Sequence, residues 1–333
     1  MRIAINGFGR IGRSVFRILD EMDGAQVLAI NDVADNEALA YLLRYDTVMG
    51  RFPGKVEVAG DVMRTDHQTV KMIEVGNPAE LPWKELGVDY VIEATGRFRK
   101  KAEIMQHITA GARKVVLTVP AKDDIDYTVV LGVNEDGLLP EHRIVSNASC
   151  TTNCLAPVAK VLHDAFGIER GVMTTVHAYT NDQRLADVPH TDWRRSRAAA
   201  ENIIPTTTGA ARAVGKVLPD LAGRLDGMAM RVPIPDGSIV DLVTVLREDV
   251  TARRVNEAVR DAASGDRLRS ILKYSVAPIV SSDIVGDPHS SIFDAPFTQV
   301  VDGRFLKTLS WYDNEWGYSN RVVDLLKLMD RLS

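Results

Sequence analysis

Three glycines near the amino terminus constrain the fold of this chain more than any other feature. Gly7, Gly9 and Gly12 form the pattern G-x-G-x-x-G directly after a short apolar run, and the segment that follows carries apolar residues at helical spacing. A second apolar run at 26–31 leads to Asp32, which lies 20 residues after Gly12. Strand, glycine turn, helix and strand in this order predict a βαβ unit whose first turn binds a dinucleotide.

Each of these residues has a physical role in such a turn. Gly7 permits the tight bend, Gly9 lets the backbone approach a pyrophosphate, and Gly12 lets the helix and strand pack closely. The carboxylate of Asp32 can accept hydrogen bonds from ribose hydroxyls, whereas a 2′-phosphate would meet a like charge. The sequence therefore predicts NAD in preference to NADP. The alternatives are a glycine turn in an unrelated βαβ unit and a helix-capping role for Asp32.

The pattern of apolar residues changes near residue 149 and predicts two domains, which suits a length of 333 residues. In 1–149, strand-like and helix-like segments alternate, which predicts a parallel sheet covered by helices, an α/β Rossmann-like domain. In 150–313, longer runs of period 2 predict an α+β domain with a mostly antiparallel sheet. The polar stretch 180–202 shows no period and predicts a long ordered loop. The strands expected in the second domain are 171–179, 227–233, 239–248, 297–301 and 304–311.

Composition and charge exclude several classes of function. The formal net charge is −5, from 40 Lys and Arg against 45 Asp and Glu, which argues against binding nucleic acid or an anionic membrane. No apolar run reaches the roughly 18–20 residues that span a bilayer, and the chain starts with a strand-like run rather than a signal peptide. Cys150 and Cys154 are too close in sequence for a disulfide framework. Reduced thiols and a cytoplasmic location are therefore expected.

A cysteine at a strand-to-helix junction is the strongest candidate for a nucleophile. Cys150 is expected in the first turn of a helix at 149–166, where the helix dipole favours an anion and lowers the pKa of a thiol. His177, on an expected strand, can accept the thiol proton and act as a general base. A buried filler cysteine and a structural histidine are the alternatives. Cys154 is expected to be a buried, inert thiol, and two cysteines at this spacing predict no metal site.

Hydroxyl and guanidinium groups in the same part of the sequence predict anion binding. Thr180 and Arg195 belong to the polar stretch, and the segment 206–209, T-T-T-G, precedes a helical stretch. Hydroxyl and N–H groups at such a position can hold an anion. Arg231 interrupts an apolar strand, where an arginine needs a partner. A phosphate ligand and a structural ion pair both satisfy that need.

Six segments together resemble the phosphorylating glyceraldehyde-3-phosphate dehydrogenase family. They are N-G-F-G-R-I-G at 6–12, S-C-T-T-N at 149–153, H-A-Y-T at 177–180, T-T-G-A-A at 207–211, M-R-V-P at 230–233 and W-Y-D-N-E-W-G-Y at 311–318. The resemblance runs from residue 1 to about residue 330. It implies an NAD-binding domain over 1–149, to which the C-terminal helix 314–333 returns, and a catalytic domain over 150–313. It also implies a homotetramer.

The resemblance assigns roles to residues of this chain. It implies that Cys150 is the nucleophile and that His177 is its base. The residues implied to bind the cofactor are Gly7, Gly9, Arg10, Ile11, Gly12, Asp32, Thr118, Asn314 and Tyr318. The residues implied to bind the substrate phosphate are Thr180, Arg195 and Arg231, and those implied to bind inorganic phosphate are Ser149, Thr151, Thr208 and Gly209.

The reaction that the resemblance implies is the NAD-dependent phosphorylating oxidation of D-glyceraldehyde 3-phosphate to 1,3-bisphosphoglycerate, in glycolysis or gluconeogenesis. It passes through a hemithioacetal and a thioester on Cys150. Erythrose-4-phosphate dehydrogenase is the nearest alternative, but that enzyme tends to lack the Tyr179-Thr180 pair and the T-T-G-A segment found here. A semialdehyde dehydrogenase would not need Thr180 and Arg231 at these positions. The non-enzymatic alternative, an NAD-sensing or RNA-binding protein, is disfavoured by the net charge and by the presence of Cys150 and His177.

Overall fold

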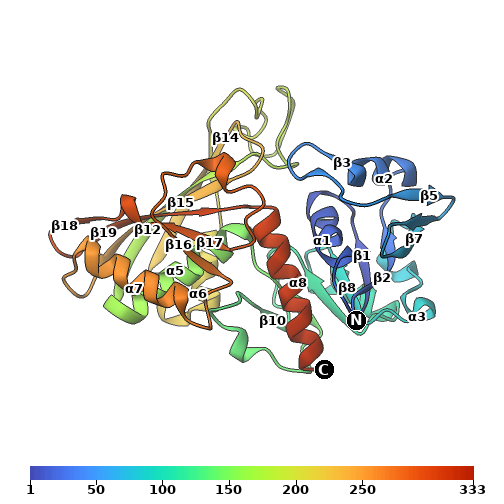
Figure 1. Ribbon diagram of the computed structural model, residues 1–333, viewed down its shortest axis with the longest axis horizontal. Coiled ribbons are helices and arrows are strands. Elements are labelled where there is room, and N and C mark those ends of the chain that lie inside the picture. Colours follow the sequence, from blue (N-terminus) through green and yellow to red (C-terminus); the bar gives the residue numbers. More distant parts are fainter. The chain divides into compact units, whose positions relative to one another are not determined.

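The computed structural model describes residues 1–333, and the chain folds into two compact units (Figure 1). The first unit contains Met1–Val129, Asp136–Ala148 and Ser319–Ser333. The second contains Val130–Glu135 and Ser149–Tyr318. The carboxyl-terminal segment therefore belongs to the same unit as the amino-terminal strands. Its end is attached there through Tyr90, whose hydroxyl donates a hydrogen bond of 3.2 Å to Asp330 Oδ1.

The first unit is built on a nine-stranded sheet in the order β10-β11-β9-β8-β1-β2-β7-β6-β5. Its strands are β1 (Arg2–Asn6), β2 (Gln26–Asn31), β5 (Glu57–Ala59), β6 (Val62–Arg64), β7 (Thr69–Ile73), β8 (Tyr90–Glu93), β9 (Lys114–Leu117), β10 (Tyr127–Thr128) and β11 (Ile144–Ser146). A separate two-stranded pair consists of β3 (Tyr45–Asp46) and β4 (Gly50–Arg51). The helices are α1 (Arg10–Asp20), α2 (Asn36–Arg44), α3 (Trp83–Leu86) and α4 (Lys101–Thr109).

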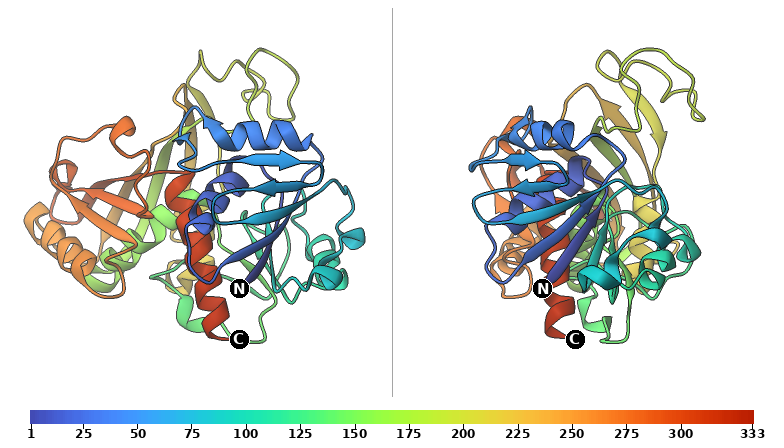
Figure 2. Two further views of the ribbon diagram at one scale, coloured as in Figure 1. Left: turned by 45° about the vertical axis from the view of Figure 1, so that its right-hand side comes forward. Right: turned by 90° about the vertical axis from the view of Figure 1, so that its right-hand side faces the viewer.

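The strand pairing confirms the predicted Rossmann-like sheet and corrects it at one edge. All neighbours from β10 to β7 are parallel, as the alternation of strands and helices predicts. β7, β6 and β5 are joined instead as an antiparallel meander, seen among the blue strands of Figure 2. Short turns make this possible: Gly60 has φ +63° between β5 and β6, and Thr65 N donates to Gln68 O at 3.0 Å between β6 and β7.

Close packing at the first glycine turn sets the position of α1 against β1. The backbone at Gly7 has φ +94°, a conformation that favours glycine, and it turns the chain sharply between strand and helix. A Cβ at Gly12 would lie 2.1 Å from Gly7 O, so any side chain there would push the helix off the turn. Val15, Phe16 and Leu19 on α1 are fully buried, which gives the helix its apolar face. The carboxyl ends of β1, β2 and β8 therefore meet at one edge of the sheet.

The second unit is built on an eight-stranded sheet in the order β13-β14-β12-β15-β19-β17-β16, with β18 paired to β19. Its strands are β12 (Ile168–Ala178), β13 (Ile204–Thr207), β14 (Leu225–Val232), β15 (Ser238–Leu246), β16 (Leu272–Ser275), β17 (Ser291–Asp294), β18 (Gln299–Val301) and β19 (Phe305–Tyr312). Its helices are α5 (Cys150–Phe166), α6 (Ala210–Val217) and α7 (Ala252–Ser264), which pack along one face of the sheet in Figure 1. The last helix, α8 (Trp316–Arg331), starts here and continues in the first unit.

The second sheet is mixed, with mostly antiparallel pairing as predicted. β15 pairs antiparallel with both β12 and β19, and its residues alternate between buried and half-buried along the whole strand. That alternation matches the period of 2 in the sequence and places one face on the core. β12–β14 and β16–β17 pair in parallel. The β12–β14 pair contributes directly to the candidate site.

The long polar stretch is the ordered loop that the sequence predicts. Residues 180–202 contain no helix or strand and only one isolated bridge, between Arg184 and Ala198. Ion pairs within the loop hold it, including Arg197 Nε with Asp187 Oδ2 at 2.9 Å. Elsewhere in the chain, no helix is long and apolar enough to cross a membrane.

Candidate active site

The candidate nucleophile begins a helix that is capped directly in front of it. Cys150 is the first residue of α5, and Ser149 is the N-cap, with its Oγ accepting a hydrogen bond of 3.1 Å from Thr152 N. Ala148, just before the cap, has φ +54°, which is uncommon for a residue with a Cβ. The backbone strain at Ala148 turns the chain from β11 into α5. Cys150 as a whole residue is half-buried.

Parallel pairing of β12 and β14 brings a histidine and an arginine to the same point. His177 and Arg231 are direct partners in the register of these strands, although they are 54 positions apart in sequence. Arg231 Nη1 lies 2.9 Å from His177 Nδ1, 3.0 Å from Ala178 O and 3.2 Å from Thr180 Oγ1. The partner that an arginine in this strand requires is therefore a set of neutral acceptors around His177.

His177 faces the thiol with its other ring nitrogen. The distance from His177 Nε2 to Cys150 Sγ is 3.5 Å. His177 Nδ1 lies 2.7 Å from Ala178 O, and the two hydrogens on Arg231 Nη1 are satisfied by Ala178 O and Thr180 Oγ1. We therefore assign the ring proton to Nδ1, which leaves Nε2 as an acceptor aimed at the thiol.

The electrostatics describe a neutral thiol–imidazole pair. Burial, and then the positive charge of Arg231, lowers the pKa of His177 to about 3. Burial also raises the pKa of Cys150, while Arg231 opposes that shift. The predicted fall in the Cys150 pKa from the helix dipole alone is thus wrong for this state, because desolvation outweighs the favourable charges. Proton transfer from Sγ to Nε2 must accompany attack by the thiol.

The predicted substrate-phosphate residues form one connected group around an unexpected carboxylate. Thr180 Oγ1 donates to Asp182 Oδ1, and Asp182 Oδ2 forms an ion pair with Arg195. Arg195 Nε also donates to Thr206 Oγ1 at 2.9 Å. Burial would raise the Asp182 pKa, but the hydrogen bond from Thr180 and the charges of Arg231 and Arg195 hold it below its usual value. Asp182 is an anion held where the sequence predicts a bound phosphate.

The predicted inorganic-phosphate residues are linked through Thr152. Thr152 Oγ1 lies 2.7 Å from Ser149 Oγ and donates to Ala210 O at 3.5 Å, which ties the start of α5 to the start of α6. Thr208 Oγ1 accepts a hydrogen bond of 3.2 Å from Ala210 N, and Gly209 is the N-cap of α6, with open space where a Cβ would be. These groups surround two helix starts, which favour an anion.

Thr151 is in a different position from the rest of that group. It is only 4% exposed, and its hydroxyl lies 2.8 Å from the hydroxyl of Tyr312, which in turn lies 2.8 Å from Thr175 Oγ1. Thr151 Oγ1 is also 4.0 Å from Cys150 Sγ. The side chain of Thr151 therefore supports the nucleophile from inside the protein in this structure.

Three of the nine predicted cofactor residues line a cavity of about 290 Å³ in the first unit. Gly7, Gly9 and Asp32 lie in its wall, and a Cβ placed on Gly9 would meet nothing within 4 Å. Asp32 Oδ2 accepts a hydrogen bond of 2.7 Å from Phe8 N, and Oδ1 accepts one of 3.1 Å from Ala34 N. The helix cap of α2 is Asp35, so the capping alternative for Asp32 does not hold. The open space beside Gly9 fits a phosphate of a nucleotide, and the half-buried carboxylate of Asp32 fits its ribose.

Arg10, Ile11 and Thr118 are also placed in the first unit. Arg10 and Ile11 are the first two residues of α1, so their backbone N–H groups belong to its first turn. The side chain of Arg10 forms an ion pair with Asp46. Thr118 follows β9, and its Oγ1 donates to Glu93 O at 3.0 Å. The roles that the resemblance gives these residues use the backbone of Arg10 and Ile11, which agrees with an arginine side chain engaged elsewhere.

Asn314 and Tyr318, the other two predicted cofactor residues, lie in the second unit. Asn314 is 5% exposed, and its Oδ1 accepts a hydrogen bond of 2.6 Å from Ser238 Oγ. Ser238 Oγ in turn accepts one of 3.1 Å from Ala178 N, next to His177. The amide of Asn314 is thus oriented, with its oxygen turned to Ser238. Tyr318 is 4% exposed near the start of α8.

The second cysteine takes no part in the site. Cys154 is fully buried, and its Sγ lies 3.5 Å from Ser291 Oγ. Burial raises the pKa of Cys154 to about 12. The expectation that the Cys154 thiol is buried is confirmed, and its raised pKa is consistent with low reactivity. No group of three or more His, Cys, Asp or Glu side chains in the chain is arranged to hold a metal ion.

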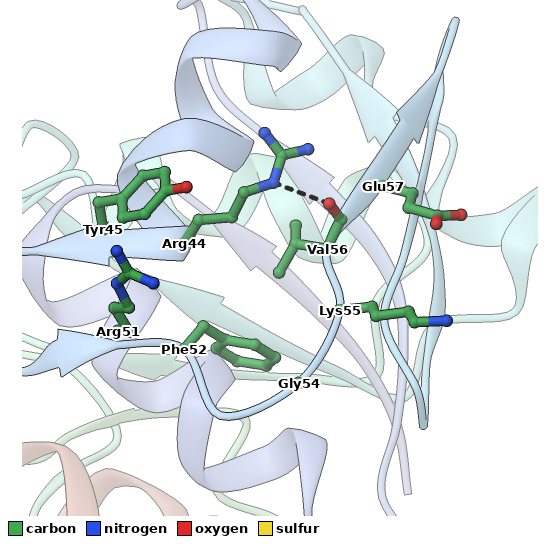
Figure 3. Close-up of a pocket in the computed structure, with 8 residues that line it drawn as sticks. All are labelled: Arg44, Tyr45, Arg51, Phe52, Gly54, Lys55, Val56 and Glu57. Carbon is green, nitrogen blue, oxygen red and sulfur yellow. Dashed lines mark hydrogen bonds between the residues drawn. The ribbon is translucent and has the colours of Figure 1, made fainter.

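A larger hollow of about 400 Å³ in the first unit contains none of the predicted residues (Figure 3). Its wall includes Arg44, Arg51 and Lys55, with Glu57 among them. Arg44 Nε donates to Val56 O at 2.7 Å, which is the hydrogen bond drawn in the figure, and the Arg51 guanidinium lies over the Tyr45 ring. Arg44 and Arg51 therefore already have partners in the protein.

Three residues of the site were missed by the sequence analysis. Asp182 lies in a loop without periodicity, Tyr312 lies on a strand beside other aromatic residues, and Ser238 begins a strand. Tyr312 and Ser238 act through contacts with segments far away in the chain, and Asp182 acts through contacts within a loop that has no period, so spacing carries no signal for any of them. Only the position of Tyr312 within the W-Y-D-N motif could have drawn attention to it.

Comparison with known proteins agrees with this geometry. A family model described as "Glyceraldehyde 3-phosphate dehydrogenase, NAD binding domain" matches residues 1–101, and one described as the C-terminal domain of the same enzyme matches residues 149–314. The chain is 56% identical over 327 residues to a glyceraldehyde-3-phosphate dehydrogenase of Streptomyces coelicolor, covering 98% of this chain and 97% of the relative. It is 56% identical over 331 residues to that of Borreliella burgdorferi, covering 98% of each, and 54% identical over 326 residues to that of Geobacillus stearothermophilus, covering 98% and 97%.

Proposed function

Because this chain belongs to the glyceraldehyde-3-phosphate dehydrogenase family, we propose that it catalyses the NAD-dependent phosphorylating oxidation of D-glyceraldehyde 3-phosphate to 1,3-bisphosphoglycerate. The observation that carries the proposal is the contact of 3.5 Å between Cys150 Sγ and His177 Nε2, with the Arg231 guanidinium 2.9 Å behind the ring. A thiol within hydrogen-bond reach of a base is the arrangement that acyl transfer through a thioester uses.

The first step is attack of the Cys150 sulfur on the aldehyde carbon. The thiol proton passes to His177 Nε2 as the C–S bond forms, and the same nitrogen returns it to the aldehyde oxygen to give a hemithioacetal. A neutral His177 is required for this step, and its low pKa ensures that Nε2 is free to accept. The carbonyl of Ala178 accepts the Nδ1 hydrogen and stabilises the imidazolium that forms briefly.

The second step oxidises the hemithioacetal carbon. His177 Nε2 removes the hydroxyl proton, the carbon loses a hydride, and the C=O bond forms again as a thioester. NAD⁺, when bound, supplies the hydride acceptor. We propose that Gly7, Gly9, Gly12 and Asp32, with the backbone of Arg10 and Ile11, hold its adenosine and diphosphate, and that Thr118, Asn314 and Tyr318 hold its nicotinamide.

The third step transfers the acyl group to inorganic phosphate. A phosphate oxygen attacks the thioester carbon, the C–S bond breaks, and Cys150 sulfur recovers a proton from His177. We assign the incoming phosphate to Ser149, Thr208 and Gly209, and to the backbone of Thr151 since its side chain is turned inward, around the starts of α5 and α6. A phosphate placed there meets hydroxyl and N–H donors rather than carboxylates.

The phosphate of the substrate is assigned to Thr180, Arg195 and Arg231. In this structure Asp182 accepts a hydrogen bond from Thr180 and forms an ion pair with Arg195. A bound phosphate would replace Asp182 as the anion that these two side chains contact. The reach of this cluster fixes the distance between the substrate phosphate and the reacting carbon. Sugars with a longer chain are therefore expected to react more slowly.

The assembly and the location of the protein are part of the proposal. We propose a homotetramer, as the resemblance implies, and a cytoplasmic location, because Cys150 and Cys154 are too close in sequence for a disulfide framework. Leu185 and Trp193 in the long loop are each 85% exposed, which leaves large apolar side chains available for a neighbouring subunit.

Trapping of the thioester tests the chemistry directly. With substrate and NAD⁺ but no phosphate, we expect an acyl group to accumulate on the peptide that contains Cys150, detected by mass spectrometry. Cys150→Ser should give no adduct and no turnover while still binding NAD⁺. Cys154→Ala, at the buried thiol of the same peptide, is the matched control and should keep the adduct. An adduct that persists in Cys150→Ser would refute the assignment.

A further inference from the structure

Two buried carboxyl groups meet beside the candidate site, on turns that are far apart in sequence. Asp236, in the turn between β14 and β15, is 2% exposed, and Asp313, between β19 and α8, is 1% exposed. Their side chains are in hydrogen-bond contact. Two carboxylates cannot share such a contact when both are ionised, because neither has a hydrogen to donate.

The donors around the pair show which of the two carries the proton. Asp313 accepts hydrogen bonds from three backbone N–H groups: Gly286 at 2.8 Å, Glu315 at 2.8 Å and Trp316 at 2.5 Å. Asp236 Oδ1 accepts one, of 2.8 Å, from Gly237 N. Asp236 Oδ2 is buried and has no donor facing it. An oxygen in this position is the one expected to bear the hydrogen, and Asp313, with three donors, is the ionised partner.

The charges near Asp236 act in the same direction. Burial, then the negative charges of Asp313 and Glu315, raises the pKa of Asp236 far above its usual range. Asp313 and Glu315 face it from the turn before α8. Cys150 faces it from the start of α5, where a charge on Asp236 would raise the pKa of the thiol. The strongest electrostatic influences on Asp236 thus all favour its neutral form.

The pair is connected to residues that the proposed function uses. Ser238, two positions after Asp236, donates to Asn314 Oδ1 at 2.6 Å, and Asn314 directly follows Asp313. Ser238 Oγ also accepts from Ala178 N at 3.1 Å, next to His177. The contact between Asp236 and Asp313 therefore joins the same two turns as the Ser238–Asn314 hydrogen bond. Any force that separates the two carboxyl groups acts on the Asn314 amide as well.

We propose that Asp236 and Asp313 share one proton, and that this proton positions Asn314 for the nicotinamide of NAD. Asp236 is accordingly a positioning residue. When Asp236 loses the proton at alkaline pH, two negative charges lie in one buried contact. The new charge on Asp236 is also close to Cys150. The turns then separate, NAD binds more weakly, and the thiol becomes harder to ionise. The link to NAD rests on the role proposed for Asn314, whereas the shared proton does not.

Asp236→Asn tests the proposal, because an asparagine amide can donate to Asp313 without ever titrating. For the natural protein, we expect the Kd for NAD⁺, measured by isothermal titration calorimetry, to rise roughly fivefold between pH 7 and pH 9.5, a coupling of ordinary size. In Asp236→Asn the Kd should change little over this range. Asp236→Ala, which lacks the donor, should bind NAD⁺ weakly at both pH values. Equal pH dependence in the natural protein and Asp236→Asn would overturn the positioning role.

Thermal unfolding and infrared spectroscopy test the shared proton without using catalysis or NAD. The folded state keeps the Asp236 proton at pH values where the unfolded state has lost it, so stability falls as pH rises. The drop in Tm between pH 6 and pH 9 should be smaller by several degrees in Asp236→Asn, and unchanged in the matched control Asp220→Asn, an exposed aspartate. The C=O stretch of a protonated carboxylic acid should be present at pH 7 and absent in Asp236→Asn. Absence of that band from the natural protein would refute the shared proton, whereas a lack of turnover would count only against the proposed function.

Discussion

The reactive pair shows what individual residues decide in this protein. Cys150 and His177 are 27 positions apart, and their identification as nucleophile and base came from residue type and the motifs around them. Their protonation state could not be derived from residue type and motifs. The sequence predicts a thiol of lowered pKa, but burial of the pair raises the Cys150 pKa and lowers that of His177 to about 3. Desolvation depends on everything packed around a group, which no local pattern contains.

The low pKa of His177 leads to a prediction about acid stability. Unfolded His177 would bind a proton below about pH 6.5, whereas the folded ring stays neutral to about pH 3, so the folded state loses stability as pH falls through this window. That loss amounts to something on the order of 3 kcal/mol between pH 7 and pH 4. His177→Asn should remove it, giving a flatter urea-denaturation profile against pH.

The same variant also tests the catalytic assignment. His177→Asn should slow turnover by about 10²–10⁴-fold, since the proton acceptor is lost. His67→Asn, at an exposed histidine, is the matched control and should leave both the turnover rate and the pH profile of stability as they are. An acid sensitivity that is the same in His177→Asn and the natural protein would contradict the buried neutral ring.

At the scale of elements, the sequence predicts helices and strands best where a periodic apolar pattern extends over many residues. The helices α5 and α1 and the strands β12, β14, β15, β18 and β19 appear close to their expected bounds, because most of them carry several apolar repeats. The strands β13, β16 and β17 of the second sheet were not predicted. The strands β5, β6 and β7 were not predicted, since most of their residues are exposed or half-buried and they contain no continuous apolar run. α7 was also missed: of its 13 residues only Val255 and Val259 are buried. Its apolar stripe is too narrow to stand out from its charged residues.

Two glycines of the first turn give a paired prediction at this scale. A Cβ on Gly9 meets open space, whereas one on Gly12 would lie 2.1 Å from Gly7 O. Gly9→Ala should therefore weaken NAD⁺ binding by intruding on the cavity, with Tm nearly unchanged. Gly12→Ala should lower Tm, because the helix must move away from β1. Calorimetric unfolding and NAD⁺ titration of both variants check this, and a Gly12→Ala protein as stable as the natural one would contradict the packing described.

At the scale of the whole molecule, the order of the motifs was the most informative signal. A parallel sheet followed by a mostly antiparallel one could be predicted from alternation and period, and the two sheets are observed. The return of the carboxyl-terminal segment to the first unit could not be derived from any period, because it depends on contacts such as that of Asp330 with Tyr90. The resemblance to a family supplied it, along with the tetramer, which stays a prediction.

The central claim is that this protein makes an acyl phosphate, and phosphate dependence tests it most directly. NADH formation from NAD⁺ and D-glyceraldehyde 3-phosphate should be followed with and without inorganic phosphate, with erythrose 4-phosphate in parallel. We predict fast turnover of the triose only when phosphate is present. Turnover that is independent of phosphate and fastest with the tetrose would contradict the proposed phosphate site at Ser149, Thr151, Thr208 and Gly209 and would indicate a hydrolytic enzyme instead.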